Sequence, residues 1–335
     1  MLRVKFITNN HGARDWMRQI PGGKGIINGC QFIFDSECES YDWLVVYDDF
    51  PKQRSGKAYR YEALNCAPSQ TILVTSEPAS IKYYEPAYVD QFAVIWTSQG
   101  PRDLRHTNVT RGPSTSLWYY GQGGEDVKTI DEMFFSSIPE KRHQISTVCS
   151  SKAQNHTLHR MRWEFTQFLK YKLPELQIFG HGVRPIGDKA ESMDAYHYHI
   201  AIENEYSPHH WTEKLSDCFL AGCLPFYYGC PNLEEYFPKE SFIRIDIKKP
   251  QASFEIISEA IQSRQYARRL DDITEARRLV LEDHNLFNRL SIRINREPTM
   301  PKSSGYCLYS RHAARLRSPL STLMAVWKKR GRLFT

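Results

Sequence analysis

Long apolar runs are the feature that this 335-residue chain most clearly lacks. No apolar stretch approaches the ~20 residues that a membrane-spanning helix needs. The N-terminus, MLRVKFITNNHG, alternates like a β-strand and has neither the apolar core nor the small-residue cleavage site of a signal peptide. We therefore expect a cytoplasmic protein.

Paired cysteines and metal-binding motifs are missing too. The eight cysteines include no C-x-x-C pair, and a chain of this length does not need disulfide staples. Cys218, Cys223 and Cys230 lie near one another, but their spacing is wide for a zinc site and no fourth ligand is evident. No Asp-x-Asp motif follows an expected strand. We expect no bound metal.

The composition is that of a globular protein, with 41% hydrophobic, 24% charged and 13% aromatic residues. A chain of 335 residues exceeds what one ordinary core supports, so two domains with a cleft are expected. The boundaries that we expect are 1–140 and 141–300, followed by a basic tail at 301–335. Residues 121–142 are the expected linker.

Short β-branched or aromatic runs alternate with helical patterns, twice along the chain. The expected strands of the first series are 2–8, 31–35, 43–47, 71–75 and 92–96, and those of the second are 145–149, 176–179, 198–202, 224–228 and 242–245. The expected helices are 13–20, 56–65, 158–171 and 211–221. Such alternation predicts parallel sheets, and hence an α/β protein with two Rossmann-like domains.

The stretch AIENEYSPHHWTEKLSDCFLAG, residues 201–222, ends an apolar strand in Glu203-Asn204 and opens a helix with Thr212-Glu213-Lys214. In open α/β sheets ligands bind beyond the carboxyl ends of the strands, where helix N-termini attract anions. A lysine in a first helical turn is unfavourable unless an anion is near, so we expect a bound phosphate. Glu213 could accept both hydroxyls of a ribose. The alternative is an ordinary helix cap with a solvated Glu–Lys pair.

The longer segment AIENEYSPHHWTEKLSDCFLAGCLPFYYGCPNLEEYFP resembles the signature of the α-1,3-fucosyltransferases, glycosyltransferase family ten. Glu203-Asn204 and Thr212-Glu213-Lys214 keep the family spacing, and the later prolines and glycine follow in order. The resemblance is specific over this segment, loose over the rest of the second domain and faint in the first.

This resemblance implies a two-domain fold of the GT-B type and an inverting, metal-independent transfer of L-fucose from GDP-fucose to a glycan hydroxyl. The second domain would bind the nucleotide sugar and the first an oligosaccharide or glycolipid, with no further cofactor. Charge on the departing diphosphate would be met by Lys214, the helix N-terminus and Arg162, which with Phe165 matches the family's Arg-x-x-Phe. The alternative for Arg162 is a surface position on an amphipathic helix.

The remaining expected donor contacts lie in the same loop. Asn204 would hydrogen-bond near the sugar or the diphosphate, and Glu203 would point into the cleft or hold the loop. His210 stands where the family usually carries a tyrosine, and Glu205 replaces a small residue. Both departures fall where the donor sugar and the guanosine would lie, so a transferase for another sugar nucleotide remains an alternative.

An inverting transfer also needs a general base. The family places a glutamate after a strand of the first domain, and TILVTSEPAS offers Glu77 in that place, with Glu85 as the fallback. The alternative for Glu77 is a Ser-Glu-Pro turn at a strand end. A non-catalytic module that binds nucleotide or glycan would need no base.

The C-terminus, RHAARLRSPLSTLMAVWKKRGRLFT, is basic and partly apolar and has no acid. Such a tail suits an anionic membrane surface, so we expect residues 311–335 to hold the protein on the inner face of a membrane. The alternatives are a helix that packs on the body and a nucleic-acid-binding tail. The clustered apolar residues argue against nucleic acid, and we expect no such partner.

Overall fold

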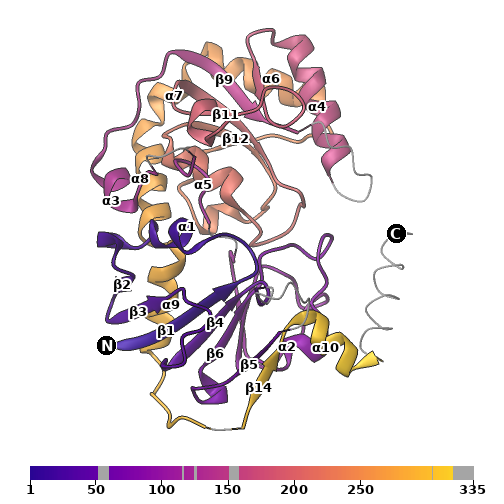
Figure 1. The fold of residues 1–335 in the computed structure, drawn as a ribbon. Coiled ribbons are helices and arrows are strands. Elements are labelled where there is room, and N and C mark those ends of the chain that lie inside the picture. Colours follow the sequence, from indigo (N-terminus) through magenta and orange to yellow (C-terminus); the bar gives the residue numbers. More distant parts are fainter. Residues whose placement is uncertain (52–59, 115–116, 124–126, 151–157, 304, 320–335) are drawn as a thin grey trace. The chain divides into compact units, whose positions relative to one another are not determined.

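The computed structural model describes the whole chain except residues 52–59, 115–116, 124–126, 151–157, 304 and 320–335. The chain divides into two compact units (Figure 1). Unit 1 combines Met1–Thr115 with Leu286–Thr335, and unit 2 is Ser116–Asn285. The expected boundaries at 140 and 300 therefore differ from those of the structure, because both ends of the chain contribute to unit 1.

Unit 1 is built on a seven-stranded sheet of order β2-β3-β1-β4-β6-β7-β8. All neighbours are parallel except β2 and β3, which are antiparallel. The strands are β1 (Leu2–Thr8), β2 (Ile26–Ile27), β3 (Cys30–Ile33), β4 (Trp43–Tyr47), β6 (Thr71–Val74), β7 (Val94–Thr97) and β8 (Val109–Arg111). The five strands predicted for the first series are confirmed, with ends shifted by a few residues. The short strands β2 and β8 were not predicted.

The helix that closes unit 1 comes from beyond unit 2 in sequence. Phe287, on α9 (Leu286–Asn295), lies 5.0 Å from Phe32 and 5.4 Å from Phe6, between ring centroids. Trp16 of α1 (Ala13–Met17) joins this aromatic cluster at 5.1 Å from Phe6. Large rings contribute much of the apolar area that a core buries, so these contacts place 286–295 in unit 1.

The C-terminal segment also belongs to unit 1. Strand β14 (Cys307–Tyr309) pairs antiparallel with β5 (Tyr61–Ala63), and α10 (Arg311–Arg317) packs on α2 (Pro86–Val89). The expected helix over 56–65 is therefore wrong where it is described, because 61–63 alternates as an exposed, buried, exposed strand. Residues 307–317 therefore pack on the body of unit 1, which is one of the alternatives to a membrane tail. Residues 320–335 of the expected membrane tail lie outside the described residues.

Unit 2 contains a five-stranded, fully parallel sheet of order β10-β9-β11-β12-β13. Its strands are β9 (His143–Val148), β10 (Gln177–Phe179), β11 (Tyr196–Ile202), β12 (Leu224–Tyr228) and β13 (Ile243–Arg244). Its helices are α3 (Ile130–Phe135), α4 (His159–Lys172), α5 (Glu213–Leu220), α6 (Pro250–Gln262), α7 (Gln265–Arg268) and α8 (Leu270–Leu281). The second series of strands and its two helices are confirmed.

The expected linker at 121–142 contains α3 and is part of unit 2. Ile130 and Met133 are buried, and Arg277 of α8 donates to the backbone carbonyls of Met133 and Ser136. A capping box between Thr129 and Glu132 starts the helix. The segment thus has its own cap and buried face, so it does not act as a loose connector.

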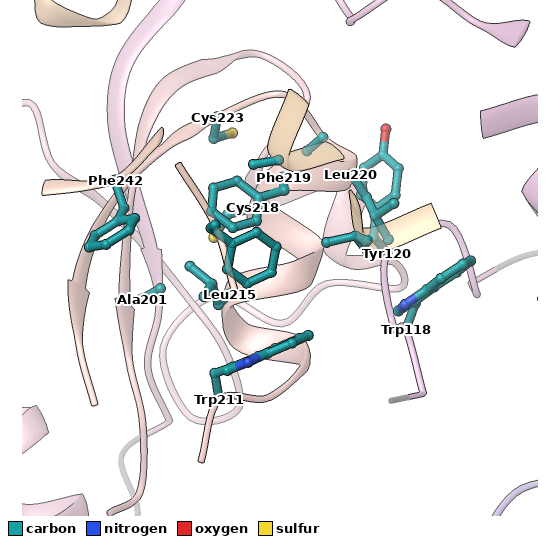
Figure 2. Close-up of a cluster of buried hydrophobic side chains, with 14 of the residues drawn as sticks. Trp118, Tyr120, Ala201, Trp211, Leu215, Cys218, Phe219, Leu220, Cys223 and Phe242 are labelled. Carbon is teal, nitrogen blue, oxygen red and sulfur yellow. The ribbon is translucent and has the colours of Figure 1, made fainter. Parts of the chain in front are cut away.

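The core of unit 2 fixes helix α5 on the sheet. Figure 2 shows Leu215, Cys218 and Phe219 of this helix clustered with Trp211 and Phe242, all of them buried. Cys218, Cys223 and Cys230 are buried in this core, and their thiols contact oxygen atoms of the chain. Burial raises the pKa of the Cys223 thiol to about 11. These cysteines are core residues.

The described residues contain neither a metal-binding cluster nor a membrane-spanning helix. In that part of the chain no three His, Cys, Asp or Glu side chains are grouped so that they could hold a metal ion. No described helix is both long and apolar enough to cross a membrane.

Candidate functional site

The start of α5 is held by a buried carboxylate at the end of β11. Glu203 accepts a hydrogen bond from the Thr212 backbone amide at 2.9 Å and another from the Thr212 hydroxyl at 2.7 Å. Thr212 in turn caps the helix by accepting from the Lys214 amide. Of the two roles expected for Glu203, the structure shows the one that holds the loop.

Gly229, at the end of β12, makes room for this carboxylate. A Cβ atom at residue 229 would lie 2.4 Å from the Glu203 Cγ atom, far inside contact distance. Any side chain at residue 229 would displace Glu203 and with it the start of α5. This explains physically why the expected family signature has a glycine at this position.

A cavity of about 170 Å³ opens beside the N-terminus of α5. Its charged lining consists of Arg162, Lys189, Glu213 and Lys214, and the wall is completed by Val148, Ser150, Met193, His199, Ile200, Ala201 and Ile202. These residues include the carboxyl ends of β9 and β11. The structure thus brings together Arg162, Glu213 and Lys214 at the edge of the sheet where α/β proteins bind ligands.

The two lysines of this cavity lie close to three carboxylates, those of Glu213, Glu203 and Asp217. Glu213 Oε1 lies 3.2 Å from Lys214 Nζ and 3.8 Å from Lys189 Nζ. Burial by itself would raise the pKa of Glu213, but the two ammonium groups outweigh it and lower that pKa to about 2. Glu213 is therefore an ionised acceptor at neutral pH, and Arg162, Lys189 and Lys214 are the cations of the lining that an anion could meet.

Arg162 reaches the cavity from α4. Its NH1 group donates to Asn204 Oδ1 at 2.5 Å, which links the helix to the loop after β11. Arg160, two residues earlier, pairs instead with Glu164 at 2.7 Å, and both of these side chains are mostly exposed. The structure therefore contradicts the alternative in which Arg162 is an ordinary surface residue of an amphipathic helix. Asn204 has a direct role in holding it.

Lys189 is the residue of this cavity that sequence reasoning missed. It comes from the short helix η3 (Lys189–Ser192), and its Nζ lies 2.9 Å from Oδ2 of the fully buried Asp217 on α5. Asp217 Oδ1 also accepts from the Tyr119 amide at 3.1 Å. Burial would lower the pKa of Lys189, but Asp217 and Glu213 outweigh it and raise that pKa. Lys189 thus supplies a third cation.

Breaking the Lys189–Asp217 pair should destabilise the protein. Lys189→Met leaves Asp217 buried without its cation, and removing one partner of a buried pair costs about 3–5 kcal/mol. We expect Lys189→Met/Asp217→Leu to recover most of this loss in urea unfolding. Arg160→Ala, which breaks an exposed pair of the same unit, should leave stability nearly unchanged. Equal stability of the double and single variants would contradict the pairing.

Two histidines near the site are buried as neutral rings. His199, on β11, lies with Nδ1 2.8 Å from Ser146 Oγ, and burial together with the nearby Lys189 lowers its pKa to about 3. His210 precedes the cap of α5, and burial lowers its pKa although Glu203 acts in the other direction. His209, beside it, hydrogen-bonds to Asn232 and Tyr236 as a loop residue.

These rings predict a loss of stability on acidification that begins above the carboxylate range. Between the ordinary histidine pKa of 6.5 and the value of about 3 for folded His199, the unfolded chain binds more protons, so stability falls as pH falls. Each such proton contributes up to about 1.4 kcal/mol per pH unit. Below 4.5 the lowered pKa of Glu213 adds to the loss in the same direction.

Urea unfolding at pH values between 6.5 and 4.5 tests this prediction. His199→Gln should flatten the decline relative to wild type, whereas His197→Gln, on the same strand but less buried, should not. An unchanged slope in His199→Gln would show that His199 is not kept neutral in the fold.

The expected base lies in unit 1. Glu77 follows β6, and its backbone carbonyl accepts from Gln99 Nε2 at 2.9 Å. Glu85, the fallback, is buried, and its two carboxylate oxygens each accept at 2.8 Å, one from Arg311 and one from Arg315. The Glu85 carboxylate is therefore already paired with two guanidinium groups. Glu77 stays the candidate for the general base.

Comparison with known proteins identifies unit 2. Residues 138–266 match the sequence profile of glycosyltransferase family 10 (fucosyltransferase), C-terminal part. This match assigns residues 138–266 to the C-terminal part of glycosyltransferase family 10. The matched range contains all the donor-site residues that the sequence predicted, from Arg162 to Lys214, together with Lys189 and Asp217.

Individual relatives match this chain over short segments. A "fucosyltransferase-like protein" of Arabidopsis thaliana is 37% identical over 59 residues, which are 17% of this chain and 12% of that protein. "Alpha-(1,3)-fucosyltransferase B" of Drosophila melanogaster is 29% identical over 75 residues, 22% of this chain and 17% of that protein. The chain thus matches less than a fifth of the length of these relatives.

The similarity in fold to known structures covers both units. A crystal structure of an α1,3-fucosyltransferase matches with a TM-score of 0.50 and 15% identity, over 91% of this chain and 92% of that chain. The chain therefore has the α/β fold with two sheets of the GT-B glycosyltransferases. At this level of identity the likeness extends to the fold alone.

Proposed function

We propose that this chain is an inverting fucosyltransferase that moves L-fucose from GDP-fucose to a hydroxyl of an oligosaccharide or glycolipid. The observation that carries the proposal is the cavity at the start of α5, whose wall combines Arg162, Lys189 and Lys214 with the ionised Glu213. Its residues fall within the part of the chain that belongs to family 10.

The cavity supplies what a departing nucleoside diphosphate needs. Negative charge grows on the diphosphate as the bond to the sugar breaks, and cations and oriented amides stabilise it most at that stage. Lys214, Arg162 and the N-terminus of α5 meet that charge, with Lys189 held close by Asp217. Glu213, ionised, accepts hydrogen bonds from the ribose hydroxyls of the donor.

The reaction itself is a single displacement. The acceptor hydroxyl attacks the anomeric carbon from the face opposite the diphosphate, a new glycosidic C–O bond forms and the bond to the diphosphate oxygen breaks. The hydroxyl proton passes to Glu77, and GDP leaves with the bonding electron pair. Because side chains supply the positive charge, this mechanism needs no divalent ion.

A panel of sugar nucleotides assayed for release of the nucleotide diphosphate tests the proposal. With a glycan acceptor and EDTA present, GDP-fucose should give the highest rate. Preference for another donor would support the alternative sugar nucleotide that His210 and Glu205 leave open. A requirement for added manganese would overturn the metal-independent mechanism. If no sugar nucleotide releases its diphosphate, the result would support a non-catalytic binding module.

We also propose that the basic segment 311–335 holds the protein on an anionic membrane. Leu316 of α10 is exposed, and Arg317 lies in the last turn of that helix. The chain should float with vesicles that contain phosphatidylserine and not with neutral phosphatidylcholine vesicles. Truncation after residue 318 should abolish flotation, and undiminished flotation of the truncated chain would contradict the proposal.

A further inference from the structure

A polar cavity of about 480 Å³ opens in unit 1, and nothing in the proposed reaction uses it. It is lined by Lys5, Ser36, Glu37, Cys38, Glu39, Arg60, Tyr61, Glu62, Ala63 and Asn65. These residues come from the middle of β1, the loop between β3 and β4, and β5 with the residues beside it. The volume lies within the range of small-molecule sites in proteins.

A buried ion pair forms part of the cavity wall. Lys5 lies within strand β1 between Val4 and Phe6, its side chain is 3% exposed, and its ammonium group pairs with Glu62 on β5. Removing two charges from water costs several kcal/mol per ion, so a buried pair adds little to stability compared with apolar residues. The fold alone does not explain a lysine here.

The ammonium group retains unused donors. Among the described residues, the Glu62 carboxylate is the one hydrogen-bond acceptor of Lys5 Nζ, and the Tyr41 ring lies 5.1 Å away. A lysine ammonium has three N–H donors, so two remain for a ligand. Such donors on a cavity wall are the polar contacts with which a site orients its ligand.

Charges of both signs continue around the cavity. Arg60 donates to the Ser36 carbonyl at 2.9 Å and to Glu37 at 3.2 Å, and approaches Glu62 to 3.8 Å. Within the described part of the chain, neither the Glu39 carboxylate nor the Asn65 side-chain amide makes a hydrogen bond or an ion pair. The ring of Tyr61 is 59% exposed and adds an apolar face.

This mixture excludes the simplest charged ligands. An anion would meet Glu37, Glu39 and Glu62, and a cation would meet Lys5 and Arg60. Hydroxyl groups both donate and accept, so a neutral polyol satisfies donors and carboxylates together. We propose that this cavity is a carbohydrate-binding site for a neutral sugar residue of a glycan, with Tyr61 against the apolar face of the sugar ring.

The site is separate from the expected base in unit 1. Glu77 follows the carboxyl end of β6 and does not line this cavity, whose wall includes the middle of β1. Sugar binding here needs neither nucleotide nor transfer. The proposal therefore goes beyond the fucosyltransferase reaction, and it can fail or hold whether or not the chain transfers fucose.

Saturation-transfer NMR and calorimetry on the full chain, without nucleotide, test the proposal. The probes are neutral disaccharides of glucose, galactose and N-acetylglucosamine, compared with glucuronic acid and inorganic phosphate. The variants are Tyr61→Ala, Glu39→Gln and Asn65→Ala, whose side chains carry few contacts of the fold. Tyr171→Ala, which removes an 82% exposed tyrosine of unit 2, is the matched control.

At least one neutral disaccharide should bind, and each cavity variant should weaken binding on the order of tenfold, equivalent to one or two lost hydrogen bonds. Tyr171→Ala should bind as wild type does. Absence of binding to every neutral sugar, binding unchanged in all three cavity variants, or preference for the acid or phosphate would each overturn the proposal. Thermal unfolding of every variant shows whether a loss of binding is a loss of fold.

Discussion

Glu77→Gln should bind GDP as tightly as the wild-type chain while glycan transfer falls by ~100- to 10,000-fold. Glutamine keeps the size and hydrogen-bonding reach of glutamate but cannot take the proton of the acceptor hydroxyl. GDP should be unaffected, because by this proposal the nucleotide binds to unit 2, whereas Glu77 follows β6 of unit 1. Initial rates of transfer and calorimetric titration with GDP measure the two quantities.

The pattern of losses separates three roles for Glu77. Loss of both GDP binding and transfer would make the residue structural or part of the donor site. Retention of both would move the base to another carboxylate of unit 1, though not to Glu85, which Arg311 and Arg315 occupy. The backbone contact between Glu77 and Gln99 Nε2 persists in the variant, so the loop after β6 keeps this support.

Arg162→Ala and Lys214→Ala should each lower turnover by about a hundredfold or more, because both side chains stabilise charge that develops as the diphosphate departs. Both residues line the cavity at the start of α5. Initial rates with GDP-fucose and a glycan acceptor measure the effect, which should be larger on turnover than on the affinity for the donor.

Arg160→Ala is the matched control for the arginine, since it removes the same group from the same helix. Arg160 pairs with Glu164 on the exposed face of α4, whereas Arg162 donates to Asn204. The control should keep wild-type turnover. Wild-type rates in both Arg162→Ala and Lys214→Ala, or an equal loss in Arg160→Ala, would contradict the assignment of the diphosphate site.

The parts of this fold that sequence reasoning predicted are those whose signals are local. Strands β4 and β12 match their predicted ends because each is an uninterrupted run of buried apolar and aromatic residues. The start of α5 was predicted because Thr212, Glu213 and Lys214 stand together at a helix cap. The structure places three residues expected from one short motif and one helix, Arg162, Glu213 and Lys214, in the wall of one cavity.

The parts that sequence reasoning missed depend on partners far away in the chain. Lys189 pairs with Asp217 across 28 positions, and Lys189 lies outside the motif at 201–222. Strand β5 forms by pairing with β14, near the other end of the chain, while the residues around it resemble a helix. The Lys5–Glu62 pair likewise joins residues 57 positions apart. Local patterns cannot show such contacts.

The division of the chain into units also sets the order in which the protein can mature during synthesis. Unit 2 is one continuous segment, so the ribosome delivers all of it before unit 1 is complete. Phe6 and Phe32 lack the ring of Phe287 until it emerges, and β5 lacks its partner until β14 follows. Domains fold as units during translation, and exposed apolar surface promotes aggregation. The N-terminal sheet, made first, is therefore finished last and is the part of the nascent chain most in need of a chaperone.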